Sequence, residues 1–358
     1  MEKFRKIGIL TSGGDAPGMN AAIRAVARKA LDKGVEVVGI RGGYSGLIKD
    51  NTVEFDPRTV SNIISRGGTM LYSDRCPEFK TEAGMRKAIE TCQRHGIDAI
   101  VAMGGDGTFR GATDLTNRGI PTIGIPCTID NDITATDYTI GFDSAMNTTL
   151  DMIDCLRDTC ESHKRCNVVE VMGRDCGQIA LCTALASGAV AAVIPEVAFD
   201  EEVFLARMKR LVEAGKRSFL VIVSEGVVTP DGKKYGELLS DKIEATLGIE
   251  SRFARFAHVV RGGSPSLRDR FTATRMGVRA VECLLEGKSN LVICERDSKI
   301  VELDINYALV ADRMYKNRLQ PGDLDAFDGD AVESMKALAA QRKENINTVY
   351  KVVGETSK

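Results

Sequence analysis

Short apolar segments alternate with longer amphipathic segments along most of the chain. The apolar segments are five to seven residues long and rich in Val and Ile, which is typical of buried strands. They are residues 6–12, 35–40, 98–104, 122–128, 166–172, 191–195, 218–223 and 256–260. The longer segments repeat apolar positions at spacings of three and four, which predicts helices over residues 19–34, 144–160 and 200–215. This alternation predicts an α/β fold with mainly parallel sheets and helices on both faces.

Two segments repeat one local design. Residues 100–112 (IVAMGGDGTFRGA) and 168–180 (VVEVMGRDCGQIA) each consist of an apolar strand, a Met-Gly pair and a glycine-containing turn into a helix. We therefore expect two similar Rossmann-like lobes. Toward the C-terminus, residues 329–345 predict one polar helix, which we expect to be followed by a frayed tail.

Charge and cysteine content narrow the class of protein. The 48 basic and 50 acidic residues nearly cancel, so no global field favours nucleic acid or a membrane surface. The sequence shows no run of eighteen apolar residues and no secretion signal, and we expect a cytoplasmic protein. The ten cysteines lie mostly in apolar segments without a C-x-x-C pair, which favours buried free thiols over disulfides. The three scattered histidines argue against a zinc site.

Glycine-rich turns follow two of the predicted strands, at residues 11–20 (TSGGDAPGMN) and 103–112 (MGGDGTFRGA). Backbone N–H groups of such a turn bind anions together with the N-terminus of the next helix, so both turns are candidates for phosphate contact. In the second turn, Asp106 is a candidate Mg²⁺ ligand, and Thr108 either caps the helix or donates to a phosphate. A tight strand–helix turn without a ligand is the alternative. The GGDGT segment also resembles the phosphate loop of NAD kinases and lipid kinases, so it does not identify the substrate by itself.

Two carboxylates end the segment IPCTIDND, residues 125–132. Residues 121–126 predict a short buried strand, so Asp130 and Asp132 should emerge at its C-terminal edge, where open α/β sheets bind ligands. Two acids so close repel each other, which raises one pKa unless a cation or hydrogen-bond donors compensate. One carboxylate can then act as a base while the other faces a metal ion. Ordinary turn chemistry for Asp-Asn-Asp is the alternative.

Several arginines lie in loops or where strands end. They are Arg75, Arg165, Arg174, Arg252, Arg255 and Arg261. A single arginine of this kind is usually a solvated surface residue. Repeated placement at strand ends instead indicates a substrate with several phosphate groups.

The motifs occur in an order that resembles one enzyme family. The segments GILTSGGDAPGMNAAIR, GGYSGL, RGGT, GGDGT, TIDNDI, TDYTIGFD, VVEVMGR, SEG, HVVRGGSP and TRMG follow one another between residues 6 and 319, as in the 6-phosphofructokinases. The resemblance implies a glycolytic kinase that transfers a phosphoryl group from Mg-ATP to the 1-hydroxyl of fructose 6-phosphate. It implies Mg²⁺ as the cofactor, ATP and fructose 6-phosphate as the ligands, and a homotetramer.

The resemblance also implies roles for individual residues. Asp130 becomes the general base, and Asp106 and Asp132 become the metal-binding residues. The implied catalytic residues are Asp130, Arg75, Thr128 and Arg174. The implied nucleotide-binding residues are Gly14, Tyr44, Arg75, Cys76, Asp106, Gly107, Thr108 and Gly111. The implied sugar-phosphate residues are Thr128, Asp130, Asp132, Arg165, Met172, Gly173, Arg174, Glu225, Arg252, His258 and Arg261, of which Arg165 and Arg252 reach the site of a neighbouring subunit.

The expected lobes are discontinuous in sequence. Residues 1–141 and 260–310 are expected to form a larger lobe that binds nucleotide phosphates and Mg²⁺. Residues 142–259 and 311–326 are expected to form a smaller lobe that binds the sugar phosphate. Residues 327–358 are expected to form a C-terminal helical extension.

Two positions bear on the phosphate donor. Pyrophosphate-using relatives carry aspartate at the position of Gly107 and lysine at that of Cys127, and this chain has neither. ATP is therefore the expected donor, and a pyrophosphate-dependent phosphotransferase is the alternative. Cys127 nonetheless replaces the glycine that is usual in ATP-using relatives.

Allosteric control is expected to be weak. Regulated relatives bind ADP or phosphoenolpyruvate between subunits through basic residues, whose positions here carry Arg24, Arg28, Arg157, Lys216 and Arg217. Pro57, Ala214 and Val190 replace two basic residues and one acidic residue of that site. Any anion is expected to bind there less tightly and with poorer discrimination for a magnesium-bound nucleotide, so activation by ADP is expected to be weak or absent.

Overall fold

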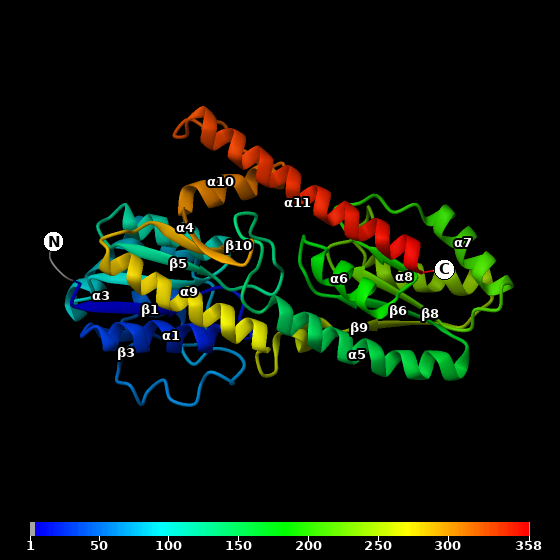
Figure 1. The fold of residues 1–358 in the computed structure, drawn as a ribbon, viewed down its shortest axis with the longest axis horizontal. Helices are drawn as coiled ribbons and strands as arrows, with labels where there is room; N and C mark the ends of the chain where they lie inside the picture. Colours follow the sequence, from blue (N-terminus) through cyan, green and yellow to red (C-terminus); the bar gives the residue numbers. More distant parts are fainter. Residues whose placement is uncertain (1–3, 358) are drawn as a thin grey trace. The chain divides into compact units, whose positions relative to one another are not determined.

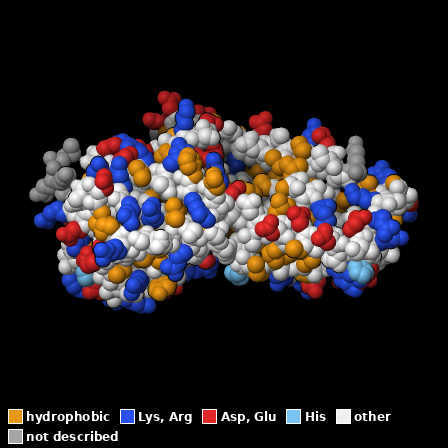
Figure 2. All heavy atoms as spheres, turned by 60° about the horizontal axis from the view of Figure 1, so that its bottom comes forward, with side chains coloured by type: hydrophobic (Ala, Val, Ile, Leu, Met, Phe, Trp, Pro, Cys, Tyr) orange, Lys and Arg blue, Asp and Glu red, His pale blue; other side chains and the backbone are white. Residues whose placement is uncertain are grey.

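The computed structural model describes residues 4–357, which divide into two compact units. Unit 1 comprises Met1–Ser144 and Arg261–Ala340, and unit 2 comprises Ala145–Val260 and Gln341–Lys358. Each unit is built around its own sheet with helices packed on it (Figure 1). Within the described range, no helix has an apolar stretch of the length needed to cross a membrane. Basic and acidic side chains are interspersed over the face shown in Figure 2, as their near balance predicts.

Unit 1 contains a seven-stranded sheet in the order β11-β10-β5-β4-β1-β2-β3. Neighbouring strands from β10 to β2 run parallel, whereas β3 and β11 pair antiparallel at the two edges. The central strands β1, β4 and β5 are mainly apolar and almost entirely buried, as the sequence predicts. The strands are β1 (Lys6–Thr11), β2 (Glu36–Ile40), β3 (Thr52–Phe55), β4 (Ala99–Gly104), β5 (Thr122–Pro126), β10 (Leu291–Arg296) and β11 (Lys299–Asp304).

The helices of unit 1 shield this sheet from water. They are α1 (Met19–Asp32), α2 (Gly43–Ile48), α3 (Glu82–His95), α4 (Asp106–Thr116), α9 (Leu267–Leu285) and α10 (Ile305–Tyr315), with the 3₁₀ helix η1 (Pro77–Lys80). Apolar residues of α2, α3, α4 and α10 form one core cluster with strand residues such as Leu10, Ile40 and Ile100. Helices α1 and α9 pack closely on each other, because Gly277 lets the α9 backbone approach α1.

Unit 2 contains a four-stranded parallel sheet in the order β7-β8-β6-β9. The strands are β6 (Cys166–Val171), β7 (Ala191–Val193), β8 (Phe219–Ser224) and β9 (Ser251–Arg255). The helices are α6 (Gln178–Ser187), α7 (Glu201–Glu213) and α8 (Tyr235–Leu247), with most of α5 (Phe142–His163) and the C-terminal part of α11 (Gly329–Thr356). Val168, Val221, Phe204 and Leu239 belong to the core between the sheet and these helices.

Two local predictions are wrong. Residues 256–260 were expected to form a strand, but the strand is β9 and is followed by the 3₁₀ helix η2 (Ala257–Arg261). Ala257 has a φ of 45°, which ends the extended backbone, and the polar residues of β9 suit an edge strand. The C-terminal helix does not fray after residue 345 but continues to Thr356, because it buries Ile346 and Val353.

The unit boundaries also differ from the expected lobes. Residues 311–326 belong to unit 1, because α10 packs on α4 rather than on the sheet of unit 2. Met335 of α11 joins Val310 and Ala311 of α10 in a small apolar cluster, so residues 327–340 also count with unit 1. The remainder of α11 counts with unit 2.

Asp269 joins α9 to residues 138–144, which include the first turn of α5. Its buried carboxylate accepts hydrogen bonds from the Tyr138 hydroxyl at 2.5 Å and from the Gly141 amide at 2.6 Å. It also accepts from the Ser144 amide at 2.9 Å and the Ser144 hydroxyl at 2.5 Å. Four donors on two oxygens compensate the loss of water around this carboxylate.

Replacing Asp269 by Asn should destabilise unit 1 by roughly 2–4 kcal/mol, because an amide oxygen cannot accept from all four donors. Urea unfolding followed by circular dichroism measures the change. Asp297→Asn is the matched control, because Asp297 is exposed. Equal unfolding midpoints for the two variants would contradict this role for Asp269.

Candidate active site

The C-terminal ends of β1, β4 and β5 bring three loops to one edge of the unit 1 sheet. These strands are parallel neighbours, so their ends meet at the same edge. The Thr108 hydroxyl donates to the Ser12 carbonyl at 3.0 Å, which links the loops after β1 and β4. The Cys127 amide donates to the Gly104 carbonyl at 3.0 Å, which links the loops after β4 and β5. The structure therefore places both predicted glycine turns beside the Asp130 segment.

Glycines at this edge serve two different purposes. A Cβ at Gly104 would lie 2.3 Å from both the Ser12 carbonyl oxygen and the Thr108 hydroxyl, so glycine is needed there for close packing. A Cβ at Gly105 or Gly107 would meet no atom within 4 Å. The turn is therefore open on the side where these Cβ atoms would lie, which leaves space beside its backbone for a ligand.

Asp106 starts α4 and has a half-buried side chain. Its Oδ2 lies 2.5 Å from Nη2 of Arg110, one helical turn later. An acid in the first turn of a helix is stabilised by the helix dipole. Within residues 4–357, no group of three metal-binding side chains gathers. A cation at Asp106 would therefore need ligands from a bound substrate.

The loop after β5 is shaped by Asn131, whose φ is 48°. The Asn131 side-chain oxygen accepts from the Thr139 amide at 3.0 Å and from the Thr139 hydroxyl at 3.2 Å. The Thr139 hydroxyl also donates to the Thr128 carbonyl at 2.7 Å. Asn tolerates this left-handed conformation well, so it fixes the turn between the two acids. Asp130 is buried, and its amide donates to the Thr128 hydroxyl at 3.2 Å.

Other predicted nucleotide residues lie around this edge with different exposure. Arg75 is exposed, and the loop that carries it and Cys76 contacts the β1 turn, where the Ser73 hydroxyl donates to the Gly13 carbonyl at 2.6 Å. Tyr44 is buried and donates to the Thr108 carbonyl at 2.6 Å. The ring of Tyr44 packs on Gly111 of α4. Tyr44 therefore contacts this helix both through its ring and through its hydroxyl group.

Arg261 belongs to the same edge. Its Nη1 donates to the Asp15 carbonyl at 2.9 Å and lies 2.9 Å from where a Cβ on Gly14 would be. The sequence grouped Arg261 with the sugar-phosphate residues, most of which lie in unit 2. The structure places it on the first glycine turn of unit 1.

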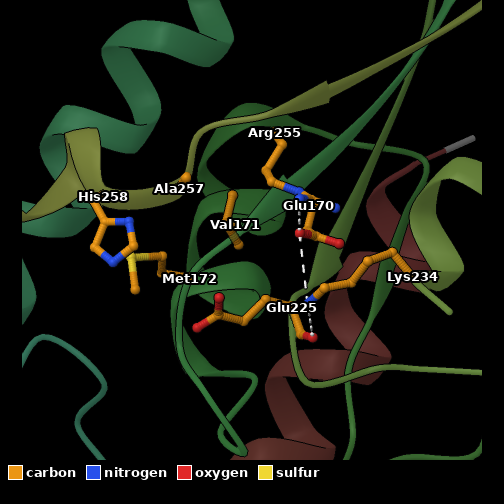
Figure 3. Close-up of a pocket in the computed structure, with 8 residues that line it drawn as sticks. All are labelled: Glu170, Val171, Met172, Glu225, Lys234, Arg255, Ala257 and His258. Atoms are coloured by element: carbon orange, nitrogen blue, oxygen red, sulfur yellow. Dashed lines mark hydrogen bonds and ion pairs between the residues drawn. The ribbon is translucent and has the colours of Figure 1, made fainter. Parts of the chain in front are cut away.

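Unit 2 has a cavity of 160 Å³ at the C-terminal ends of its strands (Figure 3). In Figure 3, Met172 and His258 lie close together on one side, and the charged groups of Glu170, Lys234 and Arg255 lie on the other. The lining residues are Glu170, Val171, Met172, Glu225, Lys234, Arg255, Ala257 and His258. Three of the predicted sugar-phosphate residues, Met172, Glu225 and His258, are among them.

Glu225 holds the turn after β6. Its Oε1 accepts from the Arg174 amide at 2.9 Å and from the Gly173 amide at 3.3 Å. Arg174 has a φ of 56°, a left-handed conformation that the Glu225 contact stabilises. The Arg174 side chain is left exposed, where it is available to a phosphate.

The cavity contains two functional candidates that the sequence analysis missed, Glu170 and Lys234. Glu170 is buried, and its Oε1 lies 2.8 Å from Nε of Arg255, the residue opposite it in the β6–β9 ladder. The Lys234 ammonium lies 3.9 Å from the same oxygen and donates to the Glu225 carbonyl at 3.0 Å. A charged residue inside the apolar segment VVEV is the signal that points to Glu170.

Arg165 lies at the opposite end of β6 from this cavity, and Arg252 lies on β9 three residues before the lining residue Arg255. Both form ion pairs with Glu250, next to the N-terminal ends of β6 and β9. The six-residue strand β6 is about 20 Å long at about 3.3 Å per residue, which separates Arg165 from the cavity at its other end. The structure therefore does not bring Arg165 to the sugar-phosphate residues of its own chain, and the side chain of Arg252 pairs with Glu250 instead.

Comparison with known proteins gives consistent matches. A family model described as Phosphofructokinase matches residues 6–284. The chain is 51% identical over 306 residues to the ATP-dependent 6-phosphofructokinase of Clostridium novyi (strain NT), covering 86% of this chain and 94% of that relative. It is 46% identical over 336 residues to the ATP-dependent 6-phosphofructokinase of Clostridioides difficile (strain 630), covering 94% of this chain and 100% of that relative.

Solved structures give the same fold. Pichia pastoris phosphofructokinase in the T-state has a TM-score of 0.85 and 34% identity; the match covers 98% of this chain and 40% of that chain. A pyrophosphate-dependent phosphofructokinase from Marinobacter aquaeolei has a TM-score of 0.75 and 25% identity, covering 84% of this chain and 83% of that chain. The predicted α/β fold class is thereby confirmed.

Proposed function

The chain belongs to the phosphofructokinase family, and on that premise we propose that it phosphorylates fructose 6-phosphate with ATP in glycolysis. The γ-phosphoryl group is transferred to the 1-hydroxyl, which gives fructose 1,6-bisphosphate and ADP. The edge of unit 1 supports this most directly, because its open glycine turn adjoins the buried Asp130 carboxylate. Phosphoryl transfer depends mainly on positioning and on stabilisation of charge, and an edge of this kind supplies both.

The donor phosphates are proposed to bind along the two glycine turns. The open backbone at Gly105 and Gly107 offers N–H donors at the start of α4. Thr108 is buried with its hydroxyl on the Ser12 carbonyl, so its part is to hold the turn. Exposed Arg75 is available to neutralise phosphate charge from the loop beside Gly13.

Asp106 and Asp132 fit a Mg²⁺ ion held largely by the donor's phosphates. Their side chains are 30% and 15% exposed, so both carboxylates retain some access to solvent. Mg²⁺ is usually bound through one or two carboxylates together with phosphate oxygens and waters, which matches this set of donors. When bound, Mg²⁺ supplies positive charge that stabilises the transferring phosphoryl group.

Asp130 is proposed as the general base. It accepts the proton of the 1-hydroxyl while that oxygen attacks the γ-phosphorus. Its burial excludes bulk water from the carboxylate, and the Asn131 turn orients it separately from Asp132. Thr128 contributes by fixing the Asp130 backbone.

The sugar phosphate is proposed to bind at the cavity of unit 2. Met172 and His258 offer a partly apolar wall, and the exposed Arg174 offers a cation for the 6-phosphate. Arg165 and Arg252 are proposed to serve a neighbouring subunit, since β6 separates Arg165 from the cavity of its own chain. A site completed by a neighbouring subunit favours a homotetramer with shared sites. We also infer that the enzyme acts in the cytoplasm.

ATP is favoured over pyrophosphate at two positions. The space around Gly107 is open, so nothing fills the place that an α-phosphate would need. Cys127 is 1% exposed, and burial raises the pKa of its thiol, so it carries no charge for gripping pyrophosphate. The relatives at 46–51% identity are named ATP-dependent, whereas a pyrophosphate-dependent structure matches at 25%.

Asp130→Asn should lower turnover by roughly 10²–10⁴, because the amide cannot accept the proton. Binding of fructose 6-phosphate, measured by isothermal titration calorimetry, should survive. Retained binding is the control for folding. Turnover close to that of the wild type would show that Asp130 is not the base.

Gly107→Asp should severely impair the use of ATP, because it places a negative charge beside Asp106 where the nucleotide phosphates bind. Gly107→Ala adds a methyl group to open space without charge and should lose much less activity. Production of fructose 1,6-bisphosphate with ATP or with pyrophosphate measures both. Substantial turnover of the wild type with pyrophosphate would overturn ATP as the donor.

A further inference from the structure

Lys316, directly after α10, places a cation beside the carboxylate edge of unit 1. Its Nζ lies 2.7 Å from Oδ2 of Asp312 and 3.5 Å from Oδ2 of Asp132. Helix α10 packs on α4, the helix that begins with Asp106. The sequence pattern does not single out Lys316, because α10 follows the Asp130 loop only after several intervening elements.

A second contact fixes Lys316 to the same loop. The buried Asp312 accepts from the Thr134 hydroxyl at 2.9 Å and from the Thr134 amide at 3.4 Å. Asp312 thus holds the Lys316 ammonium with one oxygen and the loop that contains Asp132 with the other. The end of α10 and this loop form one hydrogen-bonded unit.

The Lys316 ammonium contacts both the Asp132 and the Asp312 carboxylate. Without this cation, Asp132 and Asp312 would repel each other across a poorly solvated space. Asp132 would then be expected to move.

We propose that Lys316 is a positioning residue, which holds Asp132 in place and offsets carboxylate repulsion at the edge where the donor phosphates bind. The proposal rests on the proposed kinase function. Lys316 does not touch the reacting atoms; it acts through Asp132. Because Asp312 also orients it, the effective unit is the Asp312–Lys316 pair rather than a lysine alone.

A double-mutant cycle with Lys316→Met and Asp132→Asn tests this proposal. Lys316→Met should lower kcat by roughly 10- to 100-fold while the KM for fructose 6-phosphate changes less than about twofold. In the Asp132→Asn background, the same substitution should change kcat by less than about threefold, because the coupled partner is gone. Lys316→Arg should recover most of the loss.

Lys49→Met is the control, since Lys49 is exposed and its substitution removes the same charge from unit 1. Multiplicative effects of the two substitutions, or an unchanged kcat in Lys316→Met, would overturn the positioning role. A wild-type protein without any kinase activity would instead contradict the proposed function, so the two failures are distinguishable.

The C-terminal end of α11 packs on basic residues within unit 2. Ile346, Val353 and Ser357 are buried at helical spacings on one face of this segment. The Arg207 guanidinium of α7 donates to the Ser357 hydroxyl, and the Lys216 ammonium lies 3.5 Å from the Ser357 carbonyl oxygen. Ser357, the last described residue, therefore contacts two basic side chains.

A third cation belongs to this cluster. Arg157 lies near enough to Lys216 for their charges to interact, and it donates to the Ser187 carbonyl, while Arg207 donates to the Val190 carbonyl at 2.9 Å. In the described part of the chain, no carboxylate lies within ion-pair distance of Arg157, Arg207 or Lys216. Burial lowers the pKa of Arg207 and of Lys216, and neighbouring cations lower both further. Within residues 4–357, the oxygens that contact these three cations are neutral, and such a cluster suits an anion.

We propose that the end of α11 occupies the cation cluster formed by Arg157, Arg207 and Lys216, and that a phosphate-sized oxyanion competes with it for these cations. The oxyanion is either free phosphate or the phosphoryl group of a nucleotide. Arg157 and Lys216 match effector positions of regulated relatives; the occupant from the chain itself is the new element. Binding of the anion would release residues 346–357 from the surface of unit 2.

Hydrogen exchange of residues 346–357 in the full chain measures this competition. Inorganic phosphate at millimolar concentration should speed exchange of this segment by roughly 5- to 20-fold relative to chloride at equal ionic strength. ADP forms a second arm; an effect of ADP without one of phosphate would identify a nucleotide as the competitor. Arg207→Gln should speed exchange without any anion and should remove the anion effect.

Lys209→Gln is the matched control, because Lys209 is an exposed lysine of the same helix. It should behave as the wild type in both conditions. Exchange that is unchanged in Arg207→Gln, or unaffected by both anions in the wild type, would overturn the proposal.

Discussion

Parallel pairing of β5, β4 and β1 is the constraint on which the candidate site depends. Because these strands are adjacent and run the same way, three loops that are distant in sequence leave the sheet at one edge. Each loop is then fixed by its neighbour, through Thr108 on the Ser12 carbonyl and the Cys127 amide on the Gly104 carbonyl. The open glycine turn is therefore held in shape by the protein itself, which keeps the ordering cost of ligand binding low.

Both units stabilise an acid at a strand end with a cation from a later element. In unit 1, Asp132 follows β5 and faces Lys316. In unit 2, Glu170 lies near the end of β6 and faces Arg255 of β9, with Lys234 nearby. A buried carboxylate without such a partner would be costly, so each cation permits negative charge to remain near the C-terminal edge of its sheet. The similarity of the two units thus extends from their strand–turn–helix design to their electrostatics.

The sequence predicts features that depend on local pattern, and it fails where distant segments decide. The apolar run at residues 121–126 correctly places Asp130 and Asp132 at the end of β5. The equally apolar run at residues 256–260 is not a strand, because Ala257 leaves the extended conformation. Lys316 and the docking of α11 depend on tertiary packing, which apolar periodicity does not record. The roles of the individual site residues remain predictions that rest on the family resemblance and on geometry.

Burial of Cys127 has a consequence for redox chemistry. Oxidants and alkylating reagents attack the thiolate, and they need access to the sulfur. Cys127 is 1% exposed, and its raised pKa keeps it protonated, so neither condition is met beside the Asp130 loop. Cys155 of α5 is exposed and meets the second condition. Of these two cysteines, Cys155 is therefore the one that an oxidising environment reaches, while Cys127 stays reduced beside the Asp130 loop.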